Sequence, residues 1–280
     1  MKVPGGQGTV ELGRRTLLAV WGLGALGGCR RASAAGGRLT VAGSSTVQPV
    51  CELAAQAFER EHPGARVEVQ GGGSGAGIRT TRSGLAGVGM VSRALHPDER
   101  DLTAYTIGLD GIALIVHGTN PAQNLTRQQV VDIYTGATTD WASVGGAPGP
   151  ITVVNKEEGR STLELFEQHF GLRGRFVRNA VIIGPNGQAI ATVAASPAAV
   201  AYVSIGSATA AIAQGTPLKL LALDGVAATV ENVRSGRFPL RRELNLVTRG
   251  PAAGLARDFI TFVRGPEGRR IVAAQDFVLP

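Results

Sequence analysis

The sequence predicts an α/β protein with mostly parallel sheets flanked by helices, and three observations lead to this fold class. Short apolar runs alternate along the chain with segments in which apolar residues recur at helical spacing. This alternation is typical of βαβ units, whose strands run parallel. The apolar share of 44% excludes a disordered chain. The length of 280 residues lies near the size at which a single core stops growing, roughly 250–300 residues, so two domains are expected.

The first half of the chain body shows the alternation clearly. Val67 and Val69 alternate with polar residues, as in a strand, whereas apolar residues recur at helical spacing within 47–60. Residues 107–117 are apolar almost throughout, interrupted by Asp110-Gly111, and predict a long strand buried on both faces. The strands expected in this half are 39–42, 66–70, 88–91 and 107–117, and the helices are 47–60 and one that begins near Ala76.

The second half continues the pattern. Thr126 stands directly before a segment of helical spacing that ends at Tyr134, and threonine is a favoured helix N-cap. The other strands expected here are 151–154, 201–204, 219–223 and 244–248, and the other helices are 163–170, 188–195, 254–263 and 266–275.

The first residues have the pattern of an export signal. Arg14-Arg15 precede a short apolar stretch, 16–28, which is typical of a secretory signal peptide, and the twin arginine points to the export route for folded proteins. Cys29 follows Leu26-Gly27-Gly28, which resembles the bacterial lipobox, in which the cysteine is acylated and becomes the N-terminus. We therefore expect a lipoprotein-type signal peptide at 1–28, a linker at 29–38 and a periplasmic or membrane-anchored protein. The alternative is an ordinary signal peptide that is cut near Ala35 and removes Cys29.

Composition and residue spacing exclude several function classes. Two cysteines outside a C-x-x-C pair cannot form a disulfide framework or a cysteine-based zinc site, and the four histidines show no paired metal-binding spacing. None of the lysines follows a glycine-rich loop, so a Walker-type nucleotide site is excluded. The net charge of +7 arises from scattered arginines without aromatic interleaving, which does not indicate a nucleic-acid partner. We expect no cofactor and no metal.

Three junctions between an expected strand and an expected helix share one chemistry. Residues 43–46, 71–77 and 159–162 are rich in glycine and in serine or threonine. A helix start offers free backbone N–H groups and a partial positive charge, glycines let a ligand come close, and hydroxyls add donors. Each junction is therefore a candidate anion site at the carboxyl end of a strand. Alternatively, these residues are ordinary N-caps and turns, and their spacing does not show that they converge.

Several segments resemble the phosphate-binding proteins of ABC-type phosphate uptake. The motifs that carry the resemblance follow that family's order and are Gly43-Ser44-Ser45-Thr46-Val47-Gln48-Pro49, residues 71–77, Met90-Val91-Ser92-Arg93, Leu109-Asp110-Gly111-Ile112-Ala113, Ile133-Tyr134-Thr135-Gly136 with Trp141, Ala201-Tyr202-Val203-Ser204, and Phe238-Pro239-Leu240 with Arg241-Arg242. The resemblance extends over residues 39–280. It implies a two-domain periplasmic binding protein of type II that closes on inorganic phosphate and delivers it to an ABC permease of the inner membrane.

The resemblance also implies where the domains and the ligand contacts lie. Domain one is expected to comprise 39–112 and 248–280, and domain two 113–247. A monomer that catalyses no reaction is expected. The implied ligand-binding residues are Ser45, Thr46, Ser74, Gly75, Ser92, Arg93, Asp110, Lys156, Arg160, Ser161 and Thr162.

One departure from the family's pattern concerns the donors of the second domain. Lys156 stands where relatives commonly have an arginine, and Arg160 replaces the first serine of the loop that follows. Lysine cannot form the bidentate fork that arginine offers to an oxyanion, so Arg160 is the candidate for that role. The alternative is that Arg160 forms a surface salt bridge with Glu157.

A second departure concerns selectivity. Arg93 stands where many relatives have an aspartate, which accepts the proton of hydrogen phosphate and so rejects sulfate. Without that carboxylate, poorer discrimination between phosphate and sulfate is expected, and Asp110 or Glu158 is the alternative acceptor. Arg93 itself has the alternative of a salt bridge with Asp98.

Other function classes remain open. The chain can instead bind another oxyanion or act as an anion-sensing module without a transporter, because a fold does not decide between these roles. The weakest alternative is a serine hydrolase, in which Ser74 is the nucleophile and Asp132 or Asp140 and then His169 follow in hydrolase order. Ala76 replaces the second glycine of the nucleophile elbow, which argues against it.

Overall fold

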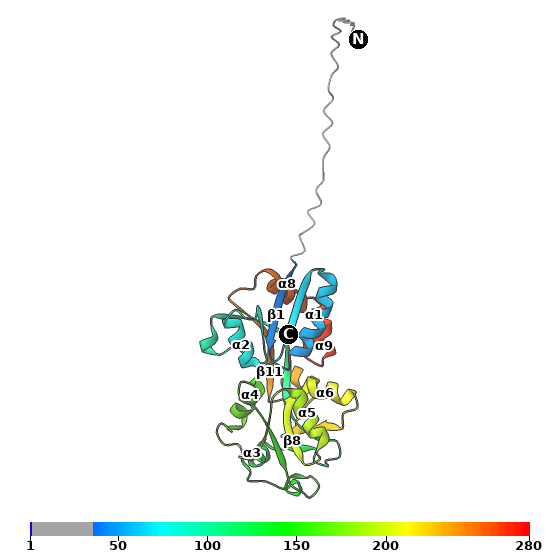
Figure 1. Cartoon of the computed structure of the whole chain (residues 1–280). Helices are drawn as coiled ribbons and strands as arrows, with labels where there is room; N and C mark the ends of the chain where they lie inside the picture. The colour runs from blue at the N-terminus through cyan, green and yellow to red at the C-terminus, as the bar shows by residue number, and fades with distance from the viewer. Residues whose placement is uncertain (2–35) are drawn as a thin grey trace. The chain divides into compact units, whose positions relative to one another are not determined.

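The computed structural model describes residue 1 and residues 36–280, and residues 36–280 belong to one compact unit (Figure 1). Residues 2–28 of the predicted signal peptide and the predicted lipidation site Cys29 lie outside the described residues. Among the described residues, no helix is both long enough and apolar enough to cross a bilayer.

A curled sheet of nine strands runs through this unit. Eight strands follow the order β2-β1-β3-β11-β4-β8-β6-β7, and β9 pairs with β4. Pairing is parallel at the two ends of the sheet, β2-β1-β3 and β8-β6-β7, and antiparallel where β4 and β11 pair in the middle. The strands are β1 (Gly37–Gly43), β2 (Ala65–Gln70), β3 (Val88–Val91), β4 (Leu102–His117), β6 (Thr152–Lys156), β7 (Val181–Ile183), β8 (Ala199–Ser204), β9 (Leu218–Leu220) and β11 (Arg241–Arg249), with β5 (Asn124–Leu125) and β10 (Ala222–Leu223) in a small separate sheet.

Helices cover the sheet on both sides, and the predicted α/β fold class is confirmed. Thr126 caps its helix as predicted, because its side chain accepts a hydrogen bond from the Gln129 amide. The sequence analysis did not predict β7, α6 or α7. The residues of α6 are mostly small, so they show no helical period of large apolar side chains. The helices are α1 (Gln48–Glu61), α2 (Ser74–Arg82), α3 (Arg127–Thr135), α4 (Ser161–Phe170), α5 (Asn186–Ala195), α6 (Ile205–Ala213), α7 (Val230–Arg234), α8 (Gly254–Arg264) and α9 (Pro266–Ala274).

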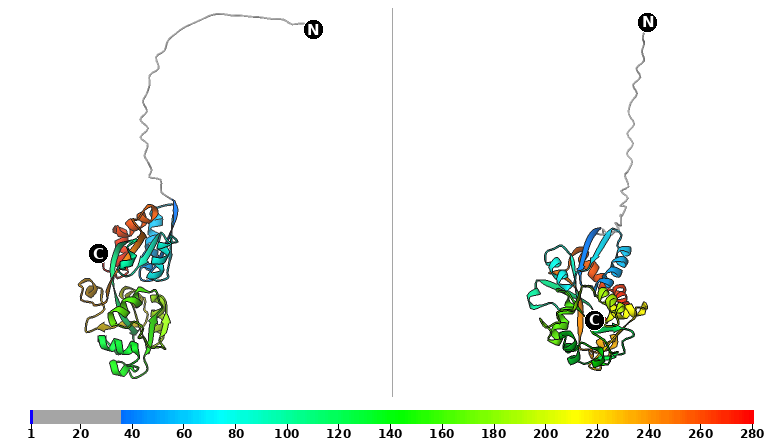
Figure 2. Two further views of the ribbon diagram at one scale, coloured as in Figure 1. Left: turned by 90° about the vertical axis from the view of Figure 1, so that its left-hand side faces the viewer. Right: turned by 60° about the horizontal axis from the view of Figure 1, so that its bottom comes forward.

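Two main hydrophobic cores divide the unit into two halves (Figure 2). The first half packs α1, α8 and α9 on β1, β2 and β3, and the second half is built around the stacked rings of Phe166 and Tyr202, whose centroids lie 3.8 Å apart. The strand β4 belongs to both halves, because Ile107 packs in the first core and Leu114 in the second. The strand β11 runs beside it and contributes Leu244 to the first core.

The long strand predicted at 107–117 is confirmed and begins earlier than predicted, since β4 runs from Leu102 through Asp110-Gly111 to His117. Glycine is required at position 111 by packing, because a Cβ there would lie 2.5 Å from Cδ1 of Ile205. The two strands β4 and β11 therefore connect the halves at a point where Asp110 and Arg242 are direct partners across the ladder.

Candidate ligand-binding site

Four serine hydroxyls meet where the two halves come together. Ser44, Ser74 and Ser92 belong to the first half, and Ser161 opens α4 in the second half. The hydroxyl of Ser74 donates to that of Ser161 at 2.9 Å, and the hydroxyls of Ser92 and Ser161 lie 2.6 Å apart. Ser44 donates to Ser92 at 2.9 Å. The three predicted loops therefore converge, and all four side chains are buried.

Arg242 binds the hydroxyls of both halves. Its guanidinium donates to Thr46 Oγ1 at 3.0 Å in the first half and to Thr162 Oγ1 at 2.8 Å in the second half. It also donates to Ser92 Oγ at 3.3 Å. Asp110 holds the guanidinium in place, because its Oδ2 atom accepts from Nη2 at 2.8 Å and from Nε at 3.1 Å. The buried arginine is thus oriented by a carboxylate and directed at a ring of hydroxyls.

The local sequence explains how the loops reach this point. Gly43 has a φ of +139°, and a Cβ there would lie 2.3 Å from the carbonyl oxygen of Met90, so only glycine lets β1 turn into α1 this close to β3. Gly73 has a φ of +85° directly before α2 and lies against the carbonyl oxygen of Gly159. The Gly75 amide donates to that carbonyl at 3.0 Å and ties the second loop to the third.

Two cations beside the cluster carry a nitrogen atom without a hydrogen-bond partner among the described residues. The Lys156 amine at the end of β6 is 3% exposed and has no hydrogen-bond partner within residues 36–280. Burial, together with charge repulsion from the nearby Arg242 and Arg160, lowers its pKa to about 7 against a smaller opposing effect of Glu157. The Nη1 atom of Arg160 also has no partner there, although the rest of its guanidinium pairs with Glu157. Buried donors without acceptors are what a site for an anion requires.

Other predicted residues lie apart from the hydroxyl cluster. The Arg93 side chain makes a bidentate pair with Glu99, at 2.7 and 2.8 Å, and donates to Glu164 at 3.0 Å, so its charge is already matched. The alternative prediction of a salt bridge between Arg93 and Asp98 is wrong, because Arg93 pairs with Glu99. The alternative prediction of a salt bridge between Arg160 and Glu157 is confirmed. The Ser45 side chain is partly exposed and makes no hydrogen bond within the described residues.

Three residues near the cluster were missing from the predicted site. Ser44 takes the place expected for Ser45, and Arg242 supplies the guanidinium expected from Arg160. Asn186 at the start of α5 donates to Thr46 Oγ1 at 3.0 Å. The sequence carries a signal for it, because Gly184-Pro185-Asn186-Gly187 is a fourth junction between a strand and a helix.

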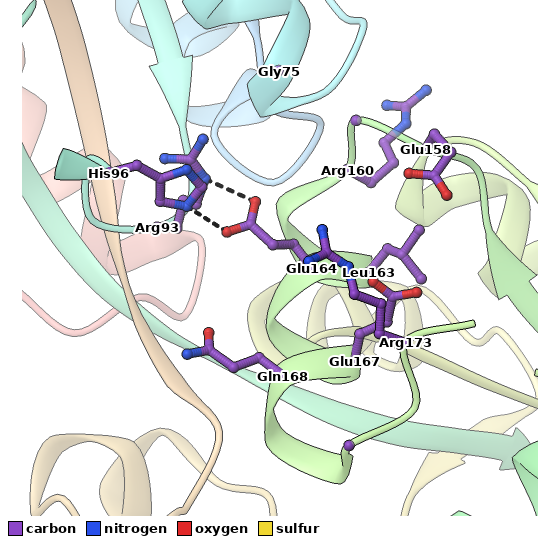
Figure 3. Close-up of a pocket in the computed structure, with 12 residues that line it drawn as sticks. Gly75, Arg93, His96, Glu158, Arg160, Leu163, Glu164, Glu167, Gln168 and Arg173 are labelled. Carbon is purple, nitrogen blue, oxygen red and sulfur yellow. Dashed lines mark hydrogen bonds and ion pairs between the residues drawn. The ribbon is translucent and has the colours of Figure 1, made fainter. Parts of the chain in front are cut away.

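A pocket of about 650 Å³ lies beside this cluster (Figure 3). In Figure 3, Arg93 and His96 point toward Glu164 on α4, and His96 Nε2 lies 2.6 Å from the Glu164 carboxylate. Glu158 and Glu167 line the same pocket. The lining sets these three carboxylates against Arg93, Arg160 and Arg173 and so offers an anion no excess of arginine charge, whereas the hydroxyl cluster offers donors from both halves and is the candidate anion site. Among the described residues, no group of three or more metal-ligating side chains occurs.

Comparisons with known proteins show which proteins this chain is similar to. A family model described as the PBP superfamily domain matches residues 30–267. A structure of a phosphate ABC transporter substrate-binding protein from Clostridium perfringens, determined with bound phosphate, has a TM-score of 0.81 and 32% identity, and the match covers 87% of this chain and all of that one. An ABC-type phosphate transport receptor from Vibrio cholerae has a TM-score of 0.67 and 29% identity over 87% of this chain and all of that one. The phosphate-binding protein PstS of Bacillus subtilis is 26% identical over 250 residues, which are 88% of this chain and 81% of the relative.

Proposed function

This chain belongs to the family of PBP superfamily domains, and from that premise we propose that it captures inorganic phosphate and delivers it to an ABC permease. The observation that carries the proposal is the ring of hydroxyls that both halves direct at Arg242. The oxygens of a tetrahedral oxyanion accept hydrogen bonds unless they carry a proton. Hydroxyls, backbone amides and a guanidinium are the donors that match such acceptors.

In this function two domains close on the ligand. They are the predicted domain one, 39–112 with 248–280, and the predicted domain two, 113–247. Support comes from the contacts between the halves, because Ser74 and Ser92 of one half lie within hydrogen-bond distance of Ser161 of the other. Binding of one anion between two domains of the same chain needs no second subunit, so we propose that the protein acts as a monomer. Its proposed place of action is outside the cytoplasmic membrane.

No catalysed reaction is part of this function. The Ser74 hydroxyl, the nucleophile of the hydrolase alternative, contacts Ser161 and Ser92 and accepts from the Ser92 amide at 3.1 Å. His169 is instead placed near Arg127 on the far end of α4, where its pKa is lowered by burial and by that arginine. A serine without a basic partner is a hydrogen-bond donor, not an activated nucleophile.

Calorimetric titration of the full-length chain with phosphate tests the proposal. Ser74→Ala should weaken binding about ten- to a hundredfold, because a lost hydrogen bond to a charged ligand costs about 1.5–3 kcal/mol. Ser83→Ala is the matched control, since Ser83 follows the other end of the same helix and is exposed. Small-angle X-ray scattering of the same protein should show a smaller radius of gyration when phosphate is bound. Absence of phosphate binding by the folded chain contradicts the proposal.

A further inference from the structure

The strand β7 forms one edge of the large sheet, and its backbone is open on the outer side. It pairs in parallel with β6, and among the described strands it has no second neighbour. The carbonyl oxygen of Ile183 accepts from the Glu157 amide at 2.8 Å, so the backbone of Ile183 faces β6. Neighbouring residues of a strand direct their backbone groups to opposite sides. The N–H and C=O of Ile182 therefore point away from β6, on the open side of the sheet.

The open edge is confined to this one residue. The Gly184 amide donates to Gln188 Oε1 at 2.9 Å, and the Ala180 amide donates to the Val177 carbonyl at 3.3 Å in a turn. Ile182 thus offers the free donor of this edge together with an acceptor. An added strand can form a pair of backbone hydrogen bonds there, and the rest of its affinity has to come from side chains.

The side chains of this edge are apolar and exposed, unlike those of the opposite edge. Ile182 is 58% exposed and Val181 is 41% exposed. At the opposite edge, β2 carries Arg66 and Glu68, two charged side chains that reach into solvent. Charged residues are a usual protection of a sheet edge against pairing with another chain. The edge of β7 lacks this protection, which is typical of a surface that a partner covers.

The turn that leads into β7 is basic. Arg173, Arg175 and Arg178 are exposed, and the ion pairs within residues 36–280 include none of them. Arg173 lies near a carboxyl group, because it opposes the rise in the pKa of Glu167 that burial and Glu158 cause. The charges of Arg175 and Arg178 are unmatched within the described residues, and a partner that complements them is acidic.

We propose that the edge of β7 is a docking site for an extended, acidic peptide segment of a partner protein. The segment adds to the sheet as a further strand. Its backbone bonds to Ile182, and its apolar side chains cover Val181 and Ile182. Its carboxylates pair with Arg175 and Arg178. The inference goes beyond the proposed phosphate function and does not depend on it.

Fluorescence anisotropy with a labelled peptide tests this inference on the full-length chain. The probe is a capped peptide of alternating glutamate and valine, about eight residues long as in an ordinary strand. The comparison peptide has lysine in place of glutamate. The glutamate peptide should bind at least about tenfold more tightly, because like charges oppose the lysine peptide. Its affinity should fall when the ionic strength rises from about 0.05 M to about 0.5 M.

Variants assign the binding to this edge. Ile182→Pro removes the outward N–H and leaves the bonds to β6, because proline is tolerated where the N–H of an edge strand faces solvent. It should weaken binding of the glutamate peptide about three- to tenfold. Arg175→Glu combined with Arg178→Glu should reverse the preference between the two peptides. Leu85→Ala removes an exposed apolar side chain of the first half and is the matched control, which should bind as the parent does.

Amide hydrogen exchange gives the direct measurement, since the glutamate peptide should protect the Ile182 amide. Circular dichroism should show the parent fold in every variant. Failure of the glutamate peptide to bind, or equal binding of both peptides, overturns the proposal. So does unchanged binding by Ile182→Pro. Binding of phosphatidylserine vesicles in place of the peptide identifies a membrane as the partner and overturns it, as does a dimer that Ile182→Pro dissociates, because a second copy then occupies the edge.

Discussion

Arg242 and Asp110 face each other across β11 and β4, and the side chain of each is 1% exposed. Such a buried ion pair does not by itself imply extra stability, because both charges lose their hydration. Its value here is geometric, since the carboxylate holds the guanidinium toward Thr46 and Thr162. The sequence resemblance includes Arg242 in a motif, but nothing in the neighbouring residues shows that its side chain enters the site.

Removing one partner of this pair should destabilise the fold more than removing both. Arg242→Met leaves Asp110 as a buried charge without a counter-ion, and we expect the free energy of unfolding to fall by about 3–5 kcal/mol. The double variant Arg242→Met with Asp110→Leu should recover most of that loss but should not bind phosphate. Urea unfolding at neutral pH measures both, with Arg241→Met, its exposed neighbour, as control. Equal stability of the single and double variants contradicts this account.

At the scale of elements, the ten-residue helix α4 contributes to the site, to the second hydrophobic core and to the contact between the halves. Its first turn places Ser161 and Thr162 in the cluster, and its buried face stacks Phe166 on Tyr202. Between them, Glu164 reaches Arg93 at 3.0 Å and His96 at 2.6 Å in the other half. The helix therefore contacts the other half beside the site through Glu164 (Figure 3) and within the site through Ser161.

Loss of the Glu164 contacts should speed up release of the ligand. Glu164 is 39% exposed, so its ion pairs with Arg93 and His96 are screened by solvent, and they contribute about 0.2–1 kcal/mol. Glu164→Gln should accordingly raise the dissociation rate of phosphate up to about fivefold. Stopped-flow displacement measures this rate. Glu167→Gln, which lines the same pocket on the next turn, should leave it unchanged, and an equal effect of both variants is evidence against a contact that holds the halves together.

At the scale of the whole molecule, the two halves are joined by β4, which contributes to the cores of both, and by β11, which pairs with β4 and contributes to the first core. Two continuous strands permit a small change of angle between the halves while each core stays packed. This arrangement suits a protein that closes on a small ion, and it requires only that the loops on either side meet, as Ser74 and Ser161 do at 2.9 Å.

A further prediction concerns the localisation of the protein, since we propose that Cys29 anchors it to the membrane. Mass spectrometry of the protein extracted from bacterial membranes should find a diacylglyceryl group on Cys29 at the N-terminus. Cys29→Ser should leave the precursor unprocessed or release the protein, whereas Cys51→Ser should not alter membrane attachment, because Cys51 is buried within α1. A soluble form that begins near Ala35 is the result that excludes lipidation.

The sequence by itself determined the α/β alternation, the start of α3 at Thr126, and the loops that supply Thr46, Ser74, Ser92, Ser161 and Thr162. These features depend on local signals, namely apolar period, N-caps and glycines, which act within a few residues. Glycines such as Gly43 were also visible as turn residues, although the close approach that requires glycine there was not.

Only the tertiary structure decided which side chains point into the site. Ser44 enters the cluster instead of Ser45, and Arg93 turns to Glu99 and Glu164. Arg242 meets Asp110 across 132 positions of sequence. The direction of a side chain depends on the segment packed against it, and that segment is distant in the chain, so no local pattern contains the information. The unpartnered amine of Lys156 is the clearest case, because being without a partner is a property of its surroundings and not of its sequence.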